Sequence, residues 1–141
     1  MAILNYTTKI DYHKTLSEIS KCLSENGAKS IMIDYEDGIP TSLNFSIELK
    51  GNIIGFQLPA RYQGVLNAME KQKVPKSLLN KEQAVRVSWR ILKDWVEAQM
   101  AIVASELAEI SEVFLPYAIT KEGSTLYEEI KGKQLGLLLT K

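Results

Sequence analysis

Asp34, Glu48 and Lys50 are the residues whose types and spacing come nearest to a catalytic set in this sequence. Glu48 follows Asp34 after 14 residues, and Lys50 stands two positions further on. Two carboxylates can hold a divalent cation, and a lysine beside them can support an attacking water molecule. This spacing makes metal-dependent cleavage of nucleic acid one hypothesis to weigh.

An Asp followed by Glu-x-Lys, on two predicted strands after a helix, resembles the motif of metal-dependent nucleases of the restriction-endonuclease superfamily. The resemblance would make Glu18, on the preceding helix, a further carboxylate. Strand alternation offers a simpler interpretation, because Glu48 continues the polar series of Ser42, Asn44 and Ser46. The nuclease is therefore the weakest of the functions considered.

The single histidine and the single cysteine carry no recognisable chemistry. His13 stands beside Asp11 and Lys14 without the nucleophile and orienting group that acid–base catalysis needs, so we expect a surface residue. Cys22 lies on the apolar stripe of a helix, as a small hydrophobic residue does. Because the sequence also lacks a Walker loop, a dinucleotide fingerprint and zinc spacing, it favours a protein that is not an enzyme and holds no metal or cofactor.

The charges are divided along the chain. Between positions 71 and 93 seven basic residues face the single acid Glu82, and between 94 and 130 eight acids face the single base Lys121. A local excess of positive charge predicts contact with nucleic acid or a nucleoprotein, while an acidic region can bind a basic groove on a protein. The candidate nucleic-acid-binding residues are Lys71, Lys73, Lys76, Lys81, Arg86, Arg90 and Lys93, and the candidate protein-binding residues are Glu106, Glu109 and Glu112.

The first 58 residues predict the order β-α-β-β-β. Residues 3–10 alternate loosely and predict a strand, and an apolar stripe of helical period predicts a helix over 12–26. Three more alternating segments follow, divided by Asp37-Gly38 and by Lys50-Gly51-Asn52. We therefore expect an α+β fold with a mainly antiparallel, four-stranded sheet packed by helices.

Residues 59–141 predict a helical part of the same single domain. A short helix over 61–72 precedes a long helix that begins near Asn80, where Asn80 and Gln83 have the spacing of a capping box. Apolar residues occupy more than half of the circumference of this long helix, which is more than one sheet face can cover. We expect the helix to lie between the sheet and either the C-terminal segment or another subunit.

The C-terminal segment is also expected to be helical. An apolar cluster occupies 110–115, a short helix is predicted over 125–131, and four leucines stand in the tail 134–141. An apolar tail has to pack on a core or on a partner. Together with the broad apolar arc of the long helix, the tail leads us to expect a homodimer.

Length and composition set the remaining expectations. The chain has 141 residues, 45% of them hydrophobic, one cysteine and no formal net charge. One core of ordinary size is therefore expected, without a disulfide. Neither a signal sequence nor an apolar run long enough to span a membrane is recognisable, so we expect a cytoplasmic protein with no membrane partner.

Two longer stretches resemble a group of small bacteriophage and mobile-element proteins that have no assigned reaction. They are Arg86-Val-Ser-Trp-Arg-Ile-Leu-Lys-Asp-Trp-Val-Glu-Ala-Gln-Met and Glu112-Val-Phe-Leu-Pro-Tyr, supported by Asn5-Tyr-Thr-Thr, Phe56-Gln-Leu-Pro-Ala and Thr125-Leu-Tyr-Glu. The resemblance implies a phage-borne accessory protein in a bacterial host. The leading hypothesis is then a nucleic-acid-binding protein, and the alternative is an inhibitor of a host defence protein, such as an anti-CRISPR protein.

Overall fold

The computed structural model describes residues 2–133, which form three strands and five α-helices. The N-terminal half comprises α1 (Tyr12–Glu25), β1 (Ser30–Glu36), β2 (Ile39–Leu49), β3 (Asn52–Pro59) and α2 (Tyr62–Lys71). The C-terminal half comprises α3 (Lys81–Ala104), α4 (Ile110–Phe114) and α5 (Leu126–Lys133), with two 3-10 helices, η1 (Lys76–Leu78) and η2 (Leu115–Tyr117). The α+β class predicted from the sequence is confirmed.

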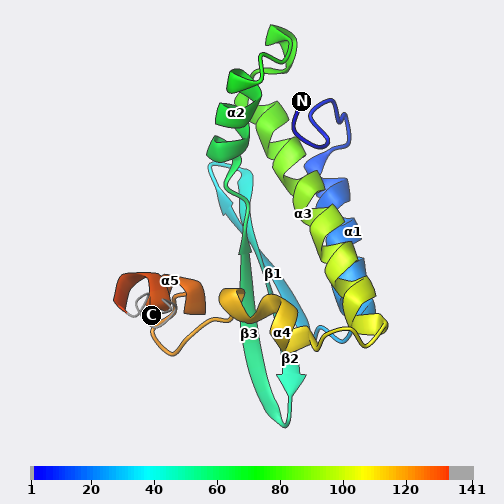
Figure 1. The fold of residues 1–141 in the computed structure, drawn as a ribbon, viewed down its shortest axis with the longest axis vertical. Coiled ribbons are helices and arrows are strands. Elements are labelled where there is room, and N and C mark those ends of the chain that lie inside the picture. Colours follow the sequence, from blue (N-terminus) through cyan, green and yellow to red (C-terminus); the bar gives the residue numbers. More distant parts are fainter. Residues whose placement is uncertain (1, 134–141) are drawn as a thin grey trace, which may run out of the picture.

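The three strands form one antiparallel sheet in the order β1-β2-β3. Alternation along β2 and β3 gives the sheet an apolar inner face, on which Phe45 and Phe56 pair with ring centroids 5.1 Å apart. Helices α1 and α3 lie side by side along this sheet (Figure 1). Trp89 of α3 is fully buried and donates its indole N–H to the carbonyl of Pro40, so one main core joins the two helices to the sheet.

The predicted fourth strand, over residues 3–10, is wrong. This segment forms turns, and Asn5 has a φ of 67°, in the left-handed region that interrupts an extended chain. Ile3 and Tyr6 pack into a second, smaller core around Val87 of α3 rather than beside a strand. Two apolar side chains of this segment therefore face a helix, whereas Leu4 is 60% exposed.

Gln83 fixes that N-terminal segment. Asn80 caps α3 by accepting from the backbone N–H of Gln83 at 2.8 Å, which is half of the predicted capping box. The Gln83 side chain does not return to the cap. It is 2% exposed and donates to the carbonyls of Tyr6 and Thr8 at 2.8 and 2.9 Å, which ties the segment to α3.

The broad apolar arc of α3 is covered from several sides. One side meets the sheet and α1 in the main core, while Val87 packs with Met69 and Val74, next to η1, in the second core. A third side is covered by the C-terminal segment, because the rings of Phe114 and Tyr117 each lie 5.5 Å from the ring of Trp95. The prediction that the C-terminal segment covers this helix is confirmed, and α2 supplies cover that the sequence did not predict.

Two further predictions concern association and the tail. The leucines at 134–141 lie outside the described residues, and the homodimer stays a prediction.

Among residues 2–133, no helix has both the length and the apolar character that crossing a bilayer demands.

Replacing Gln83 by alanine should destabilise the protein strongly. The change leaves the carbonyls of Tyr6 and Thr8 without their donor in a closely packed region, which costs about 2–3 kcal/mol. The melting temperature should fall by roughly 5–10 °C in a thermal unfolding experiment. Gln63→Ala, at an exposed position of α2, is the matched control, and an equal loss in both variants would contradict the role given to Gln83.

Candidate functional site

The seven candidate basic residues fall into two groups. Three of them, on α3, are half-buried and paired with acids. Arg90 reaches Glu18 of α1 at 2.8 Å, and Lys93 lies 3.8 Å from Glu18 and 2.7 Å from Glu97. Arg86 pairs with Glu82 at 3.0 Å and also donates to the side chain of Gln83. These three cations join helices and hold the N-terminal segment, so they contribute to the fold more than to an exposed surface.

The remaining lysines are exposed near one end of the molecule. Lys71 is the last residue of α2, Lys73 stands in the following turn with a φ of 56°, and Lys76 begins η1. None of the three forms an ion pair with a residue between 2 and 133. We call Lys71, Lys73 and Lys76 the lysine tip. Lys81 lies nearer the sheet, with its Nζ 5.4 Å from the ring centroid of Tyr62.

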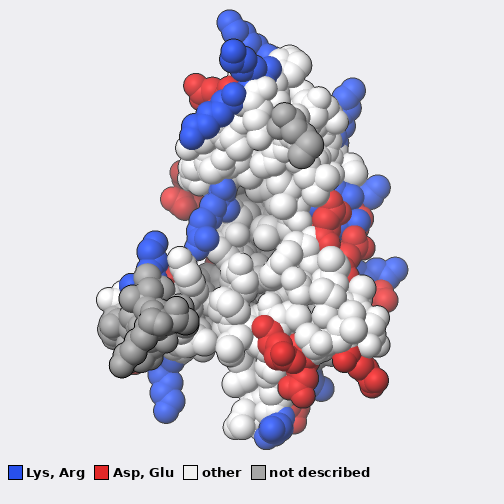
Figure 2. All heavy atoms as spheres, in the orientation of Figure 1, with Lys and Arg blue, Asp and Glu red and all other residues white. Residues whose placement is uncertain are grey.

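Two buried residues anchor the segment that carries the lysine tip. Met69 is fully buried and Val74 is 6% exposed, and both pack on Val87 of α3. The turn that carries Lys73 is therefore fixed between two apolar anchors. Figure 2 shows basic side chains gathered at this end of the molecule and others along the same side below it.

The candidate acidic residues lie beyond the other end of α3. Helix α3 has 24 residues, so its two ends are about 36 Å apart at 1.5 Å per residue. Glu109 and Glu112 form a capping box on α4, in which Glu112 accepts from the backbone N–H of Glu109 at 2.9 Å. Glu106 is exposed in the preceding turn with a φ of 59°. The lysine tip and the three candidate glutamates therefore lie near opposite ends of α3.

The nuclease candidates are not brought together. Asp34 on β1 stands opposite Ser42 on β2, and Glu48 lies six residues further along β2. At 3.3 Å per residue this separation is about 20 Å, too far for both carboxylates to bind one ion. Among residues 2–133 no group of three His, Cys, Asp or Glu side chains is placed to hold a metal ion.

Asp34 and Lys50 have local roles instead. The Asp34 carboxylate accepts from Ser42 Oγ at 2.7 Å and from Asn44 Nδ2 at 2.8 Å, and these hydrogen bonds hold the pKa of Asp34 below its ordinary value. Lys50 occupies the turn between β2 and β3 with a φ of 50°. The Asp–Glu–Lys pattern is therefore explained by a polar sheet face and a tight turn.

His13 and Cys22 occupy the positions on α1 that the sequence suggests. His13 is exposed, with its ring 4.7 Å from that of Tyr12. Cys22 is half-buried, and burial, aided by the charge of Glu97, raises the pKa of its thiol. A raised thiol pKa disfavours the reactive thiolate.

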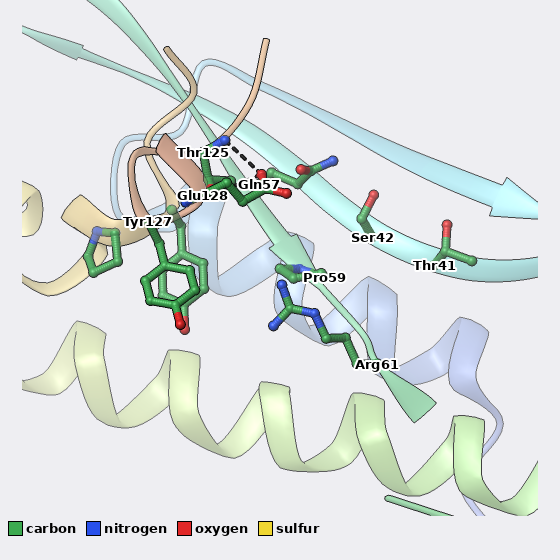
Figure 3. Close-up of a pocket in the computed structure, with 10 residues that line it drawn as sticks. Thr41, Ser42, Gln57, Pro59, Arg61, Thr125, Tyr127 and Glu128 are labelled. Atoms are coloured by element: carbon green, nitrogen blue, oxygen red, sulfur yellow. Dashed lines mark hydrogen bonds between the residues drawn. The ribbon is translucent and has the colours of Figure 1, made fainter. Parts of the chain in front are cut away.

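A pocket that the sequence did not predict lies on the polar face of the sheet. After η2, Ala118 bridges to Phe56, and the N–H of Ile119 donates to the carbonyl of Gly55 at 2.7 Å. These contacts carry the chain around the edge of β3, and the bridge between Ile119 and Thr125 turns it into α5. The result is a pocket of about 440 Å³, which we call the C-terminal pocket. It is lined by Thr41, Ser42, Gln57, Pro59, Arg61, Pro116, Tyr117, Thr125, Tyr127 and Glu128 (Figure 3).

The C-terminal pocket contains one basic and one acidic side chain. Glu128 accepts from the N–H of Thr125 at 2.8 Å and from its hydroxyl at 3.0 Å, and Thr125 caps Glu128 in return. These hydrogen bonds, with a smaller contribution from the charge of Arg61, lower the pKa of Glu128. Thr-x-x-Glu is a capping box, so this helix start was readable from the sequence, whereas its meeting with Arg61 depends on tertiary contacts.

Comparisons with known proteins leave the function open. The chain matches no protein-family model, and neither curated proteins nor solved structures contain a match to it.

Asp34→Asn should weaken the dependence of stability on pH. Because the pKa of Asp34 is lower in the folded than in the unfolded state, its ionised form stabilises the fold above pH 4, and this stabilisation is lost as pH falls through the folded-state pKa. The variant should be less stable than the parent protein at pH 7, and the difference should shrink as the pH falls below about 4.

Chemical unfolding across this pH range measures the effect. Asp37→Asn, in an exposed turn, controls for the removal of one carboxylate. A difference between the parent protein and Asp34→Asn that is independent of pH would contradict the hydrogen-bonded carboxylate described here.

Proposed function

We propose that this protein binds nucleic acid, without catalysing a reaction, through the lysine tip. The observation that supports the proposal is the exposure of these three lysines on one anchored segment, which runs from the end of α2 to the start of η1. None of them forms an ion pair with residues 2–133, although Glu70 lines the same shallow hollow as Lys71 and Lys73. Lysines on such a surface bind phosphates and release condensed counterions. Because the chain as a whole carries no net charge, the attraction has to come from a local surface of this kind.

The proposal is narrower than the seven-residue patch suggested by the sequence. Arg86, Arg90 and Lys93 are already paired with acids. Freeing Arg90 and Lys93 would break contacts between α1 and α3, and freeing Arg86 would break its contacts with Glu82 and Gln83. The phosphate contacts are therefore assigned to Lys71, Lys73 and Lys76. As part of the same proposal, the protein acts in the cytoplasm of a bacterial host, in the phage or mobile-element setting that the resemblance implies.

An inhibitor of a host protein remains the second proposal. It is supported by Leu107, which is 77% exposed and stands beside Glu106 and close to Glu109. An exposed leucine among acids suits a protein partner with a basic, partly apolar groove. A protein that acts only through the end carrying Glu106, Leu107 and Glu109 would bind no nucleic acid in a titration with oligonucleotides.

Loss of the lysine tip should weaken nucleic-acid binding and its dependence on salt. Fluorescence anisotropy with labelled single- and double-stranded oligonucleotides, at about 50 and 200 mM salt, should give a slope of log Kd against log salt of about 2–3, roughly 0.7–0.9 for each phosphate contact. In the triple variant Lys71→Gln, Lys73→Gln, Lys76→Gln, the slope should fall below about 1 and the affinity at 50 mM salt should drop at least tenfold.

The control removes the same charge from elsewhere on the surface. Lys9, Lys14 and Lys29 are exposed and lie outside the lysine tip, so their triple replacement by glutamine should change the affinity by less than about threefold. Equal losses in the two triple variants would show that net charge alone, not the tip, governs binding. Absence of binding by the parent protein at both salt concentrations would refute the proposed function.

A further inference from the structure

The C-terminal pocket contains a cation that no neighbour neutralises directly. Arg61 is exposed, and its guanidinium makes no hydrogen bond or ion pair with the described residues, although its charge acts on Glu128. Figure 3 shows its guanidinium and the phenol of Tyr127 extending from two sides into the same open space. A guanidinium presents a planar set of donors that matches two oxygens of a phosphate.

Flat rings form the walls beside this cation. Tyr117 is half-buried, and its ring is held by the ring of Trp95, whose centroid lies 5.5 Å away. Tyr127 is 49% exposed, and Pro59 and Pro116 complete the apolar part of the lining. Exposed aromatic rings of this kind are platforms on which nucleic-acid bases stack.

Two groups in the pocket are able to read a base edge. The side-chain amide of Gln57 makes no hydrogen bond with the described residues, and it offers both a donor and an acceptor. Glu128 uses Oε1 for Thr125, which leaves Oε2 to accept from an amino group. Amides and carboxylates are the groups with which proteins recognise adenine and cytosine.

The pocket is close to the lysine tip along α2. Arg61 directly precedes α2 and Lys71 ends it, and the ten residues of this helix span about 15 Å. That length equals about four base steps along one strand at 3.4 Å each. Lys81 and Arg61 also share a smaller neighbouring hollow of about 250 Å³, where Glu36 and Asp37 supply the opposite charge.

We propose that the C-terminal pocket binds one nucleotide, with its base on the tyrosine walls and its phosphate at Arg61. The pocket volume of about 440 Å³ lies within the range of small-molecule sites. This inference rests on the proposed function, to which it adds a site for an unpaired nucleotide. The nucleotide is either free or part of a single strand that continues to the lysine tip.

Calorimetric titration of the full chain with nucleoside 5′-monophosphates tests the site. Inorganic phosphate and the corresponding nucleosides are titrated separately, because the phosphate and the base are assigned to different residues. At least one monophosphate should bind more than tenfold more tightly than either inorganic phosphate or its nucleoside. Inorganic phosphate that binds as tightly as every nucleotide would overturn the assignment of the base.

Variants of two exposed side chains, Arg61 and Tyr127, separate the contribution of the phosphate to binding from that of the base. Arg61→Gln should weaken monophosphate binding about tenfold and leave nucleoside binding unchanged, while Tyr127→Ala should weaken both about tenfold. Lys121→Gln removes one charge from the exposed loop before α5, and Tyr35→Ala removes an exposed ring from β1. These controls should bind as the parent protein does, and equal weakening in them would overturn the assignment.

Single-stranded oligonucleotides distinguish the two proposals. Loss of oligonucleotide binding in the Arg61→Gln and Tyr127→Ala variants as well as in the lysine-tip variant supports both. Loss in the lysine-tip variant alone, with no monophosphate binding by the parent protein, overturns the pocket and leaves the proposed function standing. Monophosphate binding that depends on Arg61, without any oligonucleotide binding, overturns the proposed function and shows that the pocket takes a free nucleotide.

Discussion

Burial of α3 on several sides is the constraint on which the rest of this structure depends. Trp89 and Val96 are fully buried in the main core, and Val87 is fully buried in the second core. No single layer can cover side chains that point in such different directions. The sheet with α1, the helix α2 with the N-terminal segment, and the C-terminal segment are each held in place by the part of α3 that they cover.

The same arrangement determines which charges are available to a partner. Arg90 and Lys93 lie where α1 meets α3 and are paired with Glu18. Lys71, Lys73 and Lys76 lie beyond the packed part of α2, where burial of Met69 and Val74 anchors the backbone and the lysines face solvent. Pairing with acids occupies three of the seven basic residues, and the exposed lysines are the ones whose charge is available to a partner.

Local patterns predicted the regular elements, and tertiary contacts decided the rest. The helix α1, the three strands and the Asn80 cap of α3 follow from alternation, helical period and cap chemistry in nearby residues. The segment 3–10 alternates in the same way, yet the buried side chain of Gln83 folds it into turns. The C-terminal pocket was not predictable from local patterns, because Arg61 and Glu128 line one pocket only once Ala118 bridges to Phe56 of β3.

The central claim is that one face, from the lysine tip to the C-terminal pocket, contacts nucleic acid. The most direct test is to record ¹⁵N–¹H NMR spectra of the full chain while a short single-stranded oligonucleotide is added. The account predicts chemical-shift changes concentrated at residues 69–78 and around Gln57, Arg61 and Tyr127. Changes concentrated at residues 105–113, the acidic pole, or an unchanged spectrum at low salt, would contradict it.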